Sequence, residues 1–193
     1  DTDRSRPEFE KDILEQLTWL GLTWDGKPVR QSERTAFYQK HITQLLEQSH
    51  AYYCACTKEE LEAQRQSMLA QGLPPRYSGK CRDRALGPHE GTVIRFKMPS
   101  GTLSFTDIIR GPIEFNSELI GDVVIAKNLT TPLYNFAVVV DDTDMGITHV
   151  IRGEDHIPNT PKQIAFQRAL GLKRPHYAHI PLILDSGRSK MSK

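Results

Sequence analysis

The chain has 193 residues, 38% of them hydrophobic and 25% charged, a composition that is typical of a soluble globular protein and excludes a disordered or fibrous chain. Its formal net charge is only +1, so any nucleic acid must be bound by a local basic surface rather than attracted from a distance. The longest apolar run, residues 136–140, is far shorter than the ~20 residues of a membrane-spanning helix, and we expect no membrane partner.

Three amphipathic helices are predicted in the first part of the chain. Two capping boxes, Ser5 with Glu8 and Thr57 with Glu60, mark the starts of the first and the third helix. Apolar residues follow at helical spacing in each case, and glycines provide the stop signals. The predicted helices cover residues 5–20, 32–49 and 57–72.

After residue 92 the pattern changes to that of strands. Apolar and polar side chains alternate over residues 94–98 and near 103–106, which predicts an antiparallel sheet with one solvated face. Residues 123–126 and 135–140 are continuously apolar, as is typical of strands buried on both faces. Asp141 and Asp142 follow the second run, and we interpret them as turn-capping residues rather than as a metal or acid/base pair.

The last part of the chain predicts one more helix and one more buried strand. The helix begins with Thr160 as N-cap and Pro161 at its first position, and Gly171 follows its end. The strand covers residues 180–184. Helices that flank buried strands predict an α/β fold with an open, mostly parallel sheet, into which the antiparallel part is inserted.

Eight segments, in order along the whole chain, resemble bacterial glutamyl-tRNA synthetase. They are Asp-Thr-Asp-Arg at 1–4, Ser-Glu-Arg at 32–34, Ala-Tyr-Tyr-Cys at 51–54, Pro-Arg-Tyr at 75–77, Tyr-Asn-Phe-Ala-Val-Val-Val-Asp-Asp at 134–142, His-Val-Ile-Arg-Gly-Glu-Asp-His at 149–156, Asn-Thr-Pro at 159–161 and Lys-Met-Ser-Lys at 190–193. Each segment is a weak signal by itself, but eight in the correct order make coincidence negligible.

The resemblance implies a class I aminoacyl-tRNA synthetase, whose catalytic domain is Rossmann-like. Residues 1–51 then correspond to the first half of that domain, incomplete because its first strand is missing. Residues 52–133 correspond to an inserted α+β domain that binds the tRNA acceptor end, and residues 134–193 to the second half with the lysine loop. Because the first strand, its His-Ile-Gly-His signature and the anticodon-binding helices are absent from the chain, we expect the chain by itself to be inactive.

The implied activity is that of a glutamate–tRNA ligase, a monomer of the cytoplasm. Such an enzyme uses ATP with Mg²⁺ to convert L-glutamate to glutamyl adenylate, and transfers the glutamyl group to the 3′ end of tRNA(Glu). Two alternatives are a glutamyl-queuosine tRNA(Asp) synthetase and a tRNA-binding paralogue without catalysis.

Arg152 is the residue that the resemblance assigns to the side-chain carboxylate of glutamate. A planar guanidinium suits this task because it can make two parallel hydrogen bonds to a carboxylate. Without its matched neighbours, Arg152 would be interpreted as half of an ordinary surface ion pair. The other implied residues are Tyr134, Asn135, Asp155 and His156 at the glutamate pocket, Leu182 and Ile183 at adenine, and the catalytic, phosphate-binding Lys190 and Lys193.

The three cysteines form a second candidate site, inside the predicted insertion. Cys54 and Cys56 are one residue apart and Cys81 follows later, a set that nearly completes the tetrahedral coordination of a structural Zn²⁺. In zinc-binding members of the resembled family a histidine stands where this chain has Asp83, and glutamyl-queuosine relatives use a tyrosine where it has Tyr77. We favour Asp83 because carboxylate is the commoner zinc ligand. The alternative is three reduced cysteines that pack without a metal.

Overall fold

The computed structural model describes residues 5–185, 187 and 191. The chain forms two compact units, one that ends at Glu33 and one that begins at Arg34. The predicted catalytic residues Lys190 and Lys193 lie outside the described residues. Within the described part, no helix has the length and apolar character needed to cross a membrane.

The first unit contains a helix that does not begin as predicted. Its elements are helix α1 (Pro7–Trp19) and the 3₁₀ helix η1 (Gln31–Glu33). Helix α1 begins with Pro7 and has no side-chain cap, so the predicted capping box of Ser5 and Glu8 is wrong. Proline suits this first position because its φ is helical and it has no N–H that needs a partner. Arg30 donates two hydrogen bonds of 2.9 Å to Glu10 and so ties the returning segment to the helix.

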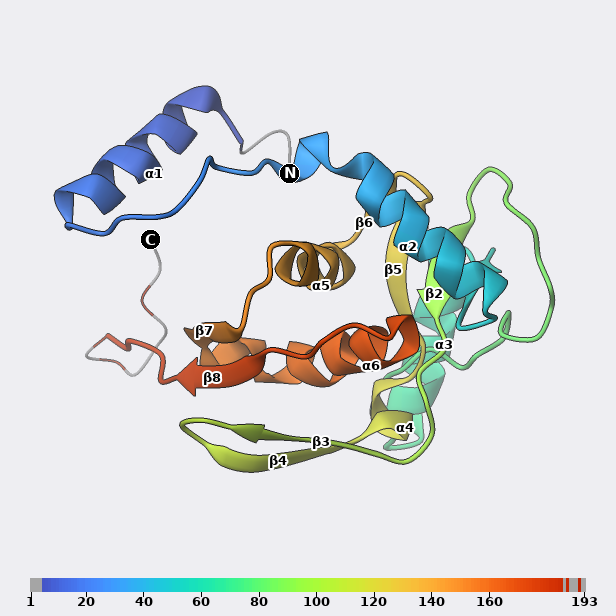
Figure 1. The fold of residues 1–193 in the computed structure, drawn as a ribbon. Coiled ribbons are helices and arrows are strands. Elements are labelled where there is room, and N and C mark those ends of the chain that lie inside the picture. Colours follow the sequence, from blue (N-terminus) through green and yellow to red (C-terminus); the bar gives the residue numbers. More distant parts are fainter. Residues whose placement is uncertain (1–4, 186, 188–190, 192–193) are drawn as a thin grey trace. The chain divides into compact units, whose positions relative to one another are not determined.

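The second unit begins with helix α2 (Thr35–Glu47) and continues to helix α3 (Lys58–Ala70), both drawn in Figure 1. The predicted capping box of α3 is confirmed. Thr57 Oγ1 accepts a hydrogen bond from the Glu60 amide at 3.2 Å, and the Glu60 carboxylate accepts one from the Thr57 amide at 3.0 Å. The two bonds satisfy backbone donors that the helix itself leaves without partners.

An antiparallel sheet packs beside these helices. Its strands lie in the order β1 (Ala51–Cys54), β2 (Val93–Phe96), β5 (Val123–Asn128) and β6 (Thr131–Pro132). The predicted strand at 123–126 is therefore confirmed, but it pairs antiparallel with β2. Strand β2 departs from the predicted alternation, because Arg95 is buried as well as Ile94 and Phe96. The Arg95 guanidinium stacks 3.8 Å from the ring centre of Tyr77, which accounts for its burial.

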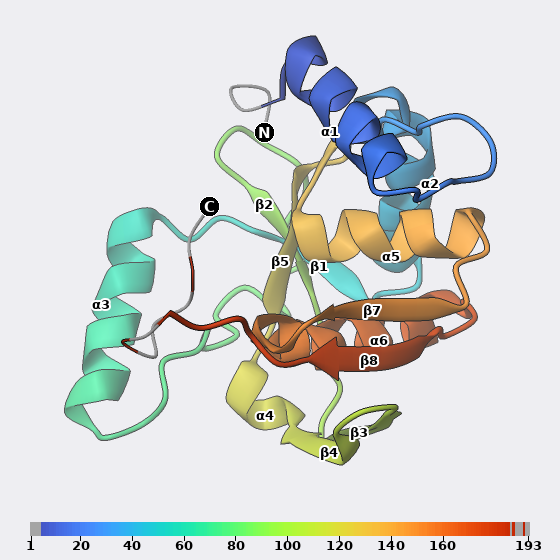
Figure 2. The same ribbon diagram turned by 90° about the vertical axis from the view of Figure 1, so that its left-hand side faces the viewer.

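A second, mixed sheet contains the two parallel strand pairings in the part of the chain that the structure describes. Its order is β4 (Gly111–Asn116), β3 (Thr102–Asp107), β8 (His176–Ile180) and β7 (His149–Gly153). Strands β7 and β8 run parallel over five residue pairs, and β3 joins β8 in parallel where Asp107 faces Tyr177. Figure 2 shows the β3–β4 hairpin next to β8 and apart from β1 and β2. The middle third of the chain thus supplies strands to both sheets.

The apolar run at 135–140 is part of a helix, so the predicted strand there is wrong. Helix α5 spans Tyr134–Asp144 and buries Phe136, Val139 and Val140. A short continuous apolar run fits a buried helix as well as a buried strand, and periodicity cannot separate the two. Asp141 lies within this helix and accepts hydrogen bonds from Arg34 at 2.8 Å and Tyr38 at 2.9 Å.

The remaining helices are α4 (Ser117–Ile120), the 3₁₀ helix η2 (Glu154–Asn159) and α6 (Thr160–Leu170). Helix α6 matches the prediction to within one residue: Asn159 is its N-cap in place of Thr160, and Gly171 ends it in the left-handed conformation. The last strand, β8, ends at Ile180, where the predicted strand was expected to begin. Helices α5 and α6 pack against each other through Phe136 and Phe166, whose ring centres are 6.0 Å apart.

Phe166 joins the two layers of the core, since its ring also meets Phe96 of β2 edge to face at 4.8 Å. We expect Phe166→Ala to lower the free energy of unfolding by about 3–5 kcal/mol, because it leaves a cavity between a sheet and two helices. Urea denaturation of the chain measures this loss. Phe9→Ala, at a half-exposed ring, is the control, and a similar loss in both variants would contradict the assignment.

Candidate functional site

The predicted glutamate-pocket residues gather where the parallel strands end and two helices begin. Arg152 lies near the end of β7, Tyr134 and Asn135 open α5, and His156 lies in η2 directly before α6. In α/β folds, ligands bind beyond the carboxyl ends of parallel strands. The amino ends of two helices add backbone N–H groups and positive dipole ends, which favour an anionic ligand.

Arg152 is held by three neutral side chains. Its Nε donates to His179 Nε2 at 3.1 Å, and its Nη2 donates to Thr160 Oγ1 at 2.8 Å and to Gln163 Oε1 at 2.9 Å. None of these bonds uses Nη1. In this arrangement the carboxylate of a ligand accepts hydrogen bonds from Nη1, or displaces Thr160 or Gln163 from Nη2. The two parallel hydrogen bonds expected from the sequence therefore require a change in the present contacts of Arg152.

The charge of Arg152 has no ion-pair partner among the residues that the structure describes. Burial lowers the pKa of its guanidinium, and the neighbouring Tyr177 and Tyr134 oxygens act in the opposite direction. Asp142 also acts on Arg152 from a distance, but burial raises the pKa of Asp142 itself. A cation that gives up water and gains only neutral partners is suited to an anionic ligand.

Tyr134, Asn135 and His156 line the same region as Arg152. The exposed Tyr134 ring faces His156 with 5.9 Å between ring centres, and the Tyr134 hydroxyl acts to raise the pKa of the Arg152 guanidinium. Asn135 donates to Asn159 at 3.2 Å and accepts from Gln163 at 3.1 Å. Asn135 is therefore part of an amide chain that connects α5 to α6 beside Arg152.

A buried Asp–His pair lies directly behind Arg152. His179 and Asp107 have fully buried side chains, and His179 Nδ1 is 2.6 Å from Asp107 Oδ2. Burial by itself would raise the pKa of Asp107. Hydrogen bonds from the Arg110 amide, the His179 ring and the His179 and Ile109 amides outweigh it and lower that pKa to about 2.

Leu182 and Ile183, the predicted adenine residues, follow β8 at the same edge of the sheet. The Leu182 amide donates to Glu154 Oε1 at 3.1 Å, and the Ile183 carbonyl accepts from the Met191 amide at 3.2 Å. The other oxygen of Glu154 is bound by Arg110. Asp155 is exposed, and its carboxylate lies so close to Gly153 that a side chain at 153 would meet it at 2.6 Å. Some of the backbone groups that are predicted to bind adenine thus already form hydrogen bonds within the protein.

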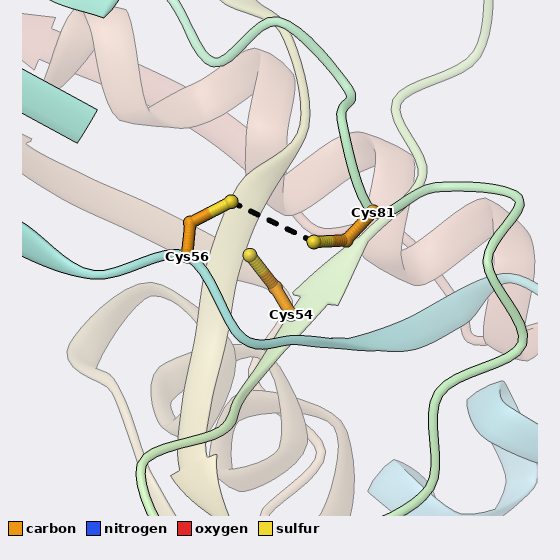
Figure 3. Close-up of side chains that lie close together, drawn as sticks. All are labelled: Cys54, Cys56 and Cys81. Carbon is orange, nitrogen blue, oxygen red and sulfur yellow. Dashed lines mark hydrogen bonds between the residues drawn. The ribbon is translucent and has the colours of Figure 1, made fainter. Parts of the chain in front are cut away.

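The three cysteines form a cluster at the other sheet, as Figure 3 shows. The sulfur atoms of Cys54, Cys56 and Cys81 all lie within 4.8 Å of one another, and the sulfurs of Cys56 and Cys81 are 3.6 Å apart. Burial raises the pKa of the Cys56 thiol to about 11. Burial also acts to raise the pKa of Cys81, but hydrogen bonds from Tyr77 and the Ala55 amide outweigh it and lower that pKa to about 7.

Of the two oxygen groups predicted as the fourth ligand, the structure places Tyr77, and not Asp83, at this cluster. The Tyr77 hydroxyl is 3.3 Å from the Cys54 sulfur and 3.5 Å from the Cys56 sulfur, and it accepts from the Cys81 amide at 2.9 Å. The carboxylate of Asp83 does not belong to the group of atoms that lie within 4.8 Å of one another, which consists of the three cysteine sulfurs. Asp83 instead lines a cavity of about 300 Å³, whose other lining residues include Tyr77, Arg82 and Asp122.

A family model described as the catalytic domain of the class I tRNA synthetases (E and Q) matches residues 1–193. The chain belongs to this family. The predicted fold class, an α/β class I synthetase catalytic domain, is thereby confirmed. The order of the motifs in the sequence had indicated the same family.

Relatives within the class I synthetase family are longer than this chain. Glutamate–tRNA ligase of Aquifex aeolicus is 51% identical over 201 residues, which cover 100% of this chain and 42% of the relative. Glutamate–tRNA ligase of Carboxydothermus hydrogenoformans is 49% identical, with 44% of its length covered. A crystal structure of glutamate-tRNA synthetase from Elizabethkingia anophelis superimposes with a TM-score of 0.84 at 36% identity, and 44% of it is covered. The chain spans less than half the length of these relatives.

Sequence reasoning missed the residues of this synthetase domain that surround Arg152. They are Asp107, Asn159, Gln163 and His179, and the structure adds Thr160 as a hydrogen-bond acceptor. One signal was present in the sequence. His179 stands between Ala178 and Ile180 in a strand, where a buried polar side chain needs a partner.

The lowered pKa of Asp107 predicts that the free energy of unfolding depends on pH in the acid range. Because its pKa is lower in the folded than in the unfolded state, its stabilising effect is present above pH ~4 and is lost as the pH falls toward ~2. Urea denaturation of the chain between pH 2 and 4 measures this. We expect Asp107→Asn to reduce the proton uptake on unfolding by up to about one proton, and Asp25→Asn, at an exposed position, is the control. If the free energy of unfolding changed with pH equally steeply in wild type and in Asp107→Asn, the prediction would be contradicted.

Proposed function

We propose that this chain is the part of a glutamate–tRNA ligase that binds L-glutamate and ATP. The observation that carries the proposal is the guanidinium of Arg152, which lies at the carboxyl ends of two parallel strands and has only neutral hydrogen-bond partners. The names of the relatives at 51% and 49% identity support the same assignment.

Selection of glutamate follows from the charge of Arg152. A glutamate side-chain carboxylate neutralises the guanidinium and bonds to Nη1, whereas the amide of glutamine leaves the buried charge without a counter-ion. Tyr134 stands beside Arg152 with a half-exposed ring and a hydroxyl that acts on the guanidinium. In this proposal Tyr134 and His156 form the wall of the pocket, and Asn135 holds α5 against α6.

The proposed reaction has two steps. The α-carboxylate of glutamate attacks the α-phosphorus of ATP, bound with Mg²⁺, and pyrophosphate leaves. The terminal ribose hydroxyl of tRNA(Glu) then attacks the glutamyl adenylate, and AMP leaves. Lys190 and Lys193 are proposed to neutralise the departing pyrophosphate, because two ammonium groups three positions apart in the sequence can reach the phosphates of the nucleotide. The backbone at Leu182 and Ile183 is proposed to bind adenine.

The cysteine cluster is proposed to hold a structural Zn²⁺ through Cys54, Cys56, Cys81 and Tyr77. A tetrahedral site with zinc–sulfur bonds of about 2.3 Å places its sulfurs about 3.8 Å apart, close to the 3.6 Å between Cys56 and Cys81. The Tyr77 hydroxyl lies 3.3 Å from the Cys54 sulfur and 3.5 Å from the Cys56 sulfur and offers the fourth ligand atom. The ion would tie β1 to the loop of Cys81 and stiffen the region at 52–133 that we propose to bind the tRNA acceptor end.

The second candidate function is a glutamyl-queuosine tRNA(Asp) synthetase. One observation favours it, namely that Tyr77 rather than Asp83 reaches the thiols, which matches the tyrosine ligand of that branch. We favour the ligase because its relatives match the whole chain at 47–51% identity. We further propose that the protein acts in the cytoplasm as a monomer.

The first test concerns amino-acid selection by the full-length gene product. We expect Arg152→Gln to reduce kcat/KM for glutamate by at least about 100-fold in tRNA-supported ATP–pyrophosphate exchange, since a buried charge-assisted contact to the substrate is lost. The preference for glutamate over glutamine should fall by a similar factor. Arg168→Gln, at an exposed position on the same chain, is the matched control. An unchanged preference in Arg152→Gln would refute the assignment of Arg152.

The second test concerns the metal. We expect the isolated chain to bind about one zinc ion, with loss in Cys56→Ser and much weaker binding in Tyr77→Phe. Asp83→Asn should bind as tightly as wild type, because its carboxylate is not within the cluster. Titration against a chromogenic chelator, with metal content from atomic emission, gives the affinities. The opposite order for Tyr77→Phe and Asp83→Asn would make Asp83 the ligand, and no zinc in wild type would remove the site altogether.

A further inference from the structure

We infer that Asp107 and His179 are positioning residues for Arg152: the carboxylate fixes the imidazole, and the imidazole fixes the guanidinium that selects the substrate. This inference rests on the proposed role of Arg152 in glutamate binding. It adds a residue from the β3–β4 hairpin, Asp107, to a proposed pocket that otherwise draws on β7, η2, β8, α5 and α6.

Two independent contacts specify the same tautomer of His179. Asp107 has a pKa of about 2 and so is an acceptor at neutral pH, which requires the proton of the imidazole on Nδ1, at 2.6 Å. On the other side, Arg152 Nε is only a donor and lies 3.1 Å from Nε2, which requires Nε2 to be without a proton. The ring is therefore neutral, with its lone pair directed at Arg152.

Asp107 is itself held rigidly. Its Oδ1 accepts hydrogen bonds from the amides of Ile109 and Arg110, both at 3.0 Å, and from the amide of His179 at 3.2 Å. Its Oδ2 is left for the His179 ring. Because every bond of this carboxylate fixes it to the β3–β4 turn or to β8, the imidazole has one orientation available to it.

The same turn also reaches the predicted adenine segment. Arg110 donates through Nε to the His179 carbonyl at 3.3 Å and binds Glu154, whose second oxygen accepts from the Leu182 amide. The turn at residues 107–110 thus supports the backbone on both sides of the site. A hairpin from the middle of the chain places the groups that a glutamate and an adenine ring are proposed to meet.

A neutral imidazole is a chemically specific choice behind a substrate-binding arginine. A carboxylate directly on Nε would neutralise the guanidinium and compete with the substrate carboxylate for its charge. An imidazole whose own proton goes to a carboxylate accepts the Nε–H firmly and leaves the positive charge for the ligand. Nε2 also lies 3.3 Å from the Thr160 hydroxyl, which itself accepts from Arg152 Nη2, so the imidazole and the hydroxyl hold the guanidinium together.

Two substitutions at His179 separate the positioning role from a structural one. The side-chain oxygen of glutamine can occupy the place of Nε2 and accept from Arg152, but it leaves Asp107 without a donor. The side-chain nitrogen of asparagine can occupy the place of Nδ1 and donate to Asp107, but it leaves Arg152 Nε without an acceptor. The positioning role predicts that His179→Gln retains function better, and a structural role of the Asp–His bond predicts the reverse.

We would measure tRNA-supported ATP–pyrophosphate exchange with the full-length gene product. We expect His179→Asn to raise KM for glutamate about 10-fold or more, the effect of losing a hydrogen bond to a charged group. KM for ATP and the unfolding temperature should change less, and His179→Gln should raise KM for glutamate less than His179→Asn does. Equal or reversed effects of the two variants on KM for glutamate would overturn the inference.

A measurement on the wild-type protein tests the same inference without any variant that has to fold. Long-range ¹H–¹⁵N correlation spectra of histidine-labelled protein report which ring nitrogen of His179 carries the proton. We expect Nδ1–H with a bare Nε2, and a proton on Nε2 overturns the inference. Failure of the proposed function has a different signature, because wild-type protein would then show no glutamate-dependent exchange while the tautomer of His179 stayed as described.

Discussion

The arrangement of the site depends on how the guanidinium of Arg152 is kept charged without a carboxylate partner. Removing a cation from water is costly, and proteins usually offset that cost with an opposite charge. Here the described partners of Arg152 are an imidazole, a hydroxyl and an amide. In the function that we propose, the counter-ion is supplied by the ligand, so the same contacts that hold the guanidinium would also select an anionic substrate.

The three neutral groups that accept hydrogen bonds from Arg152 come from two different segments of the chain. His179 comes from β8, and Thr160 and Gln163 come from the first turn of α6, which follows β7 after one short 3₁₀ helix. Asp107 comes from a hairpin that lies about seventy positions earlier in the chain and joins the same sheet through a single parallel pair. The part of the chain from β1 to β6 therefore contributes to two places, the proposed amino-acid pocket through β3 and the cysteine cluster through β1 and the loop of Cys81.

Local patterns predicted the elements whose stability is local. The capping box of Thr57 and Glu60 formed as expected, because both of its hydrogen bonds join residues three positions apart. The box of Ser5 and Glu8 did not form, because Pro7 offers a better helix start. The strand predicted over 135–140 is helix α5, since a run of apolar residues records burial but not the backbone conformation in which the residues are buried.

The sequence by itself determined the family and the α/β class, because the order of motifs along a chain can be recognised without any knowledge of how the side chains pack. Only the tertiary structure decided which side chains hold Arg152, and which oxygen, that of Tyr77 or that of Asp83, stands beside the thiols. The physical reason is the reach of a hydrogen bond. It acts over about 3 Å, whereas the partners His179 and Asp107 lie 27 and 72 positions away from the residues they bind, and no local pattern encodes that meeting.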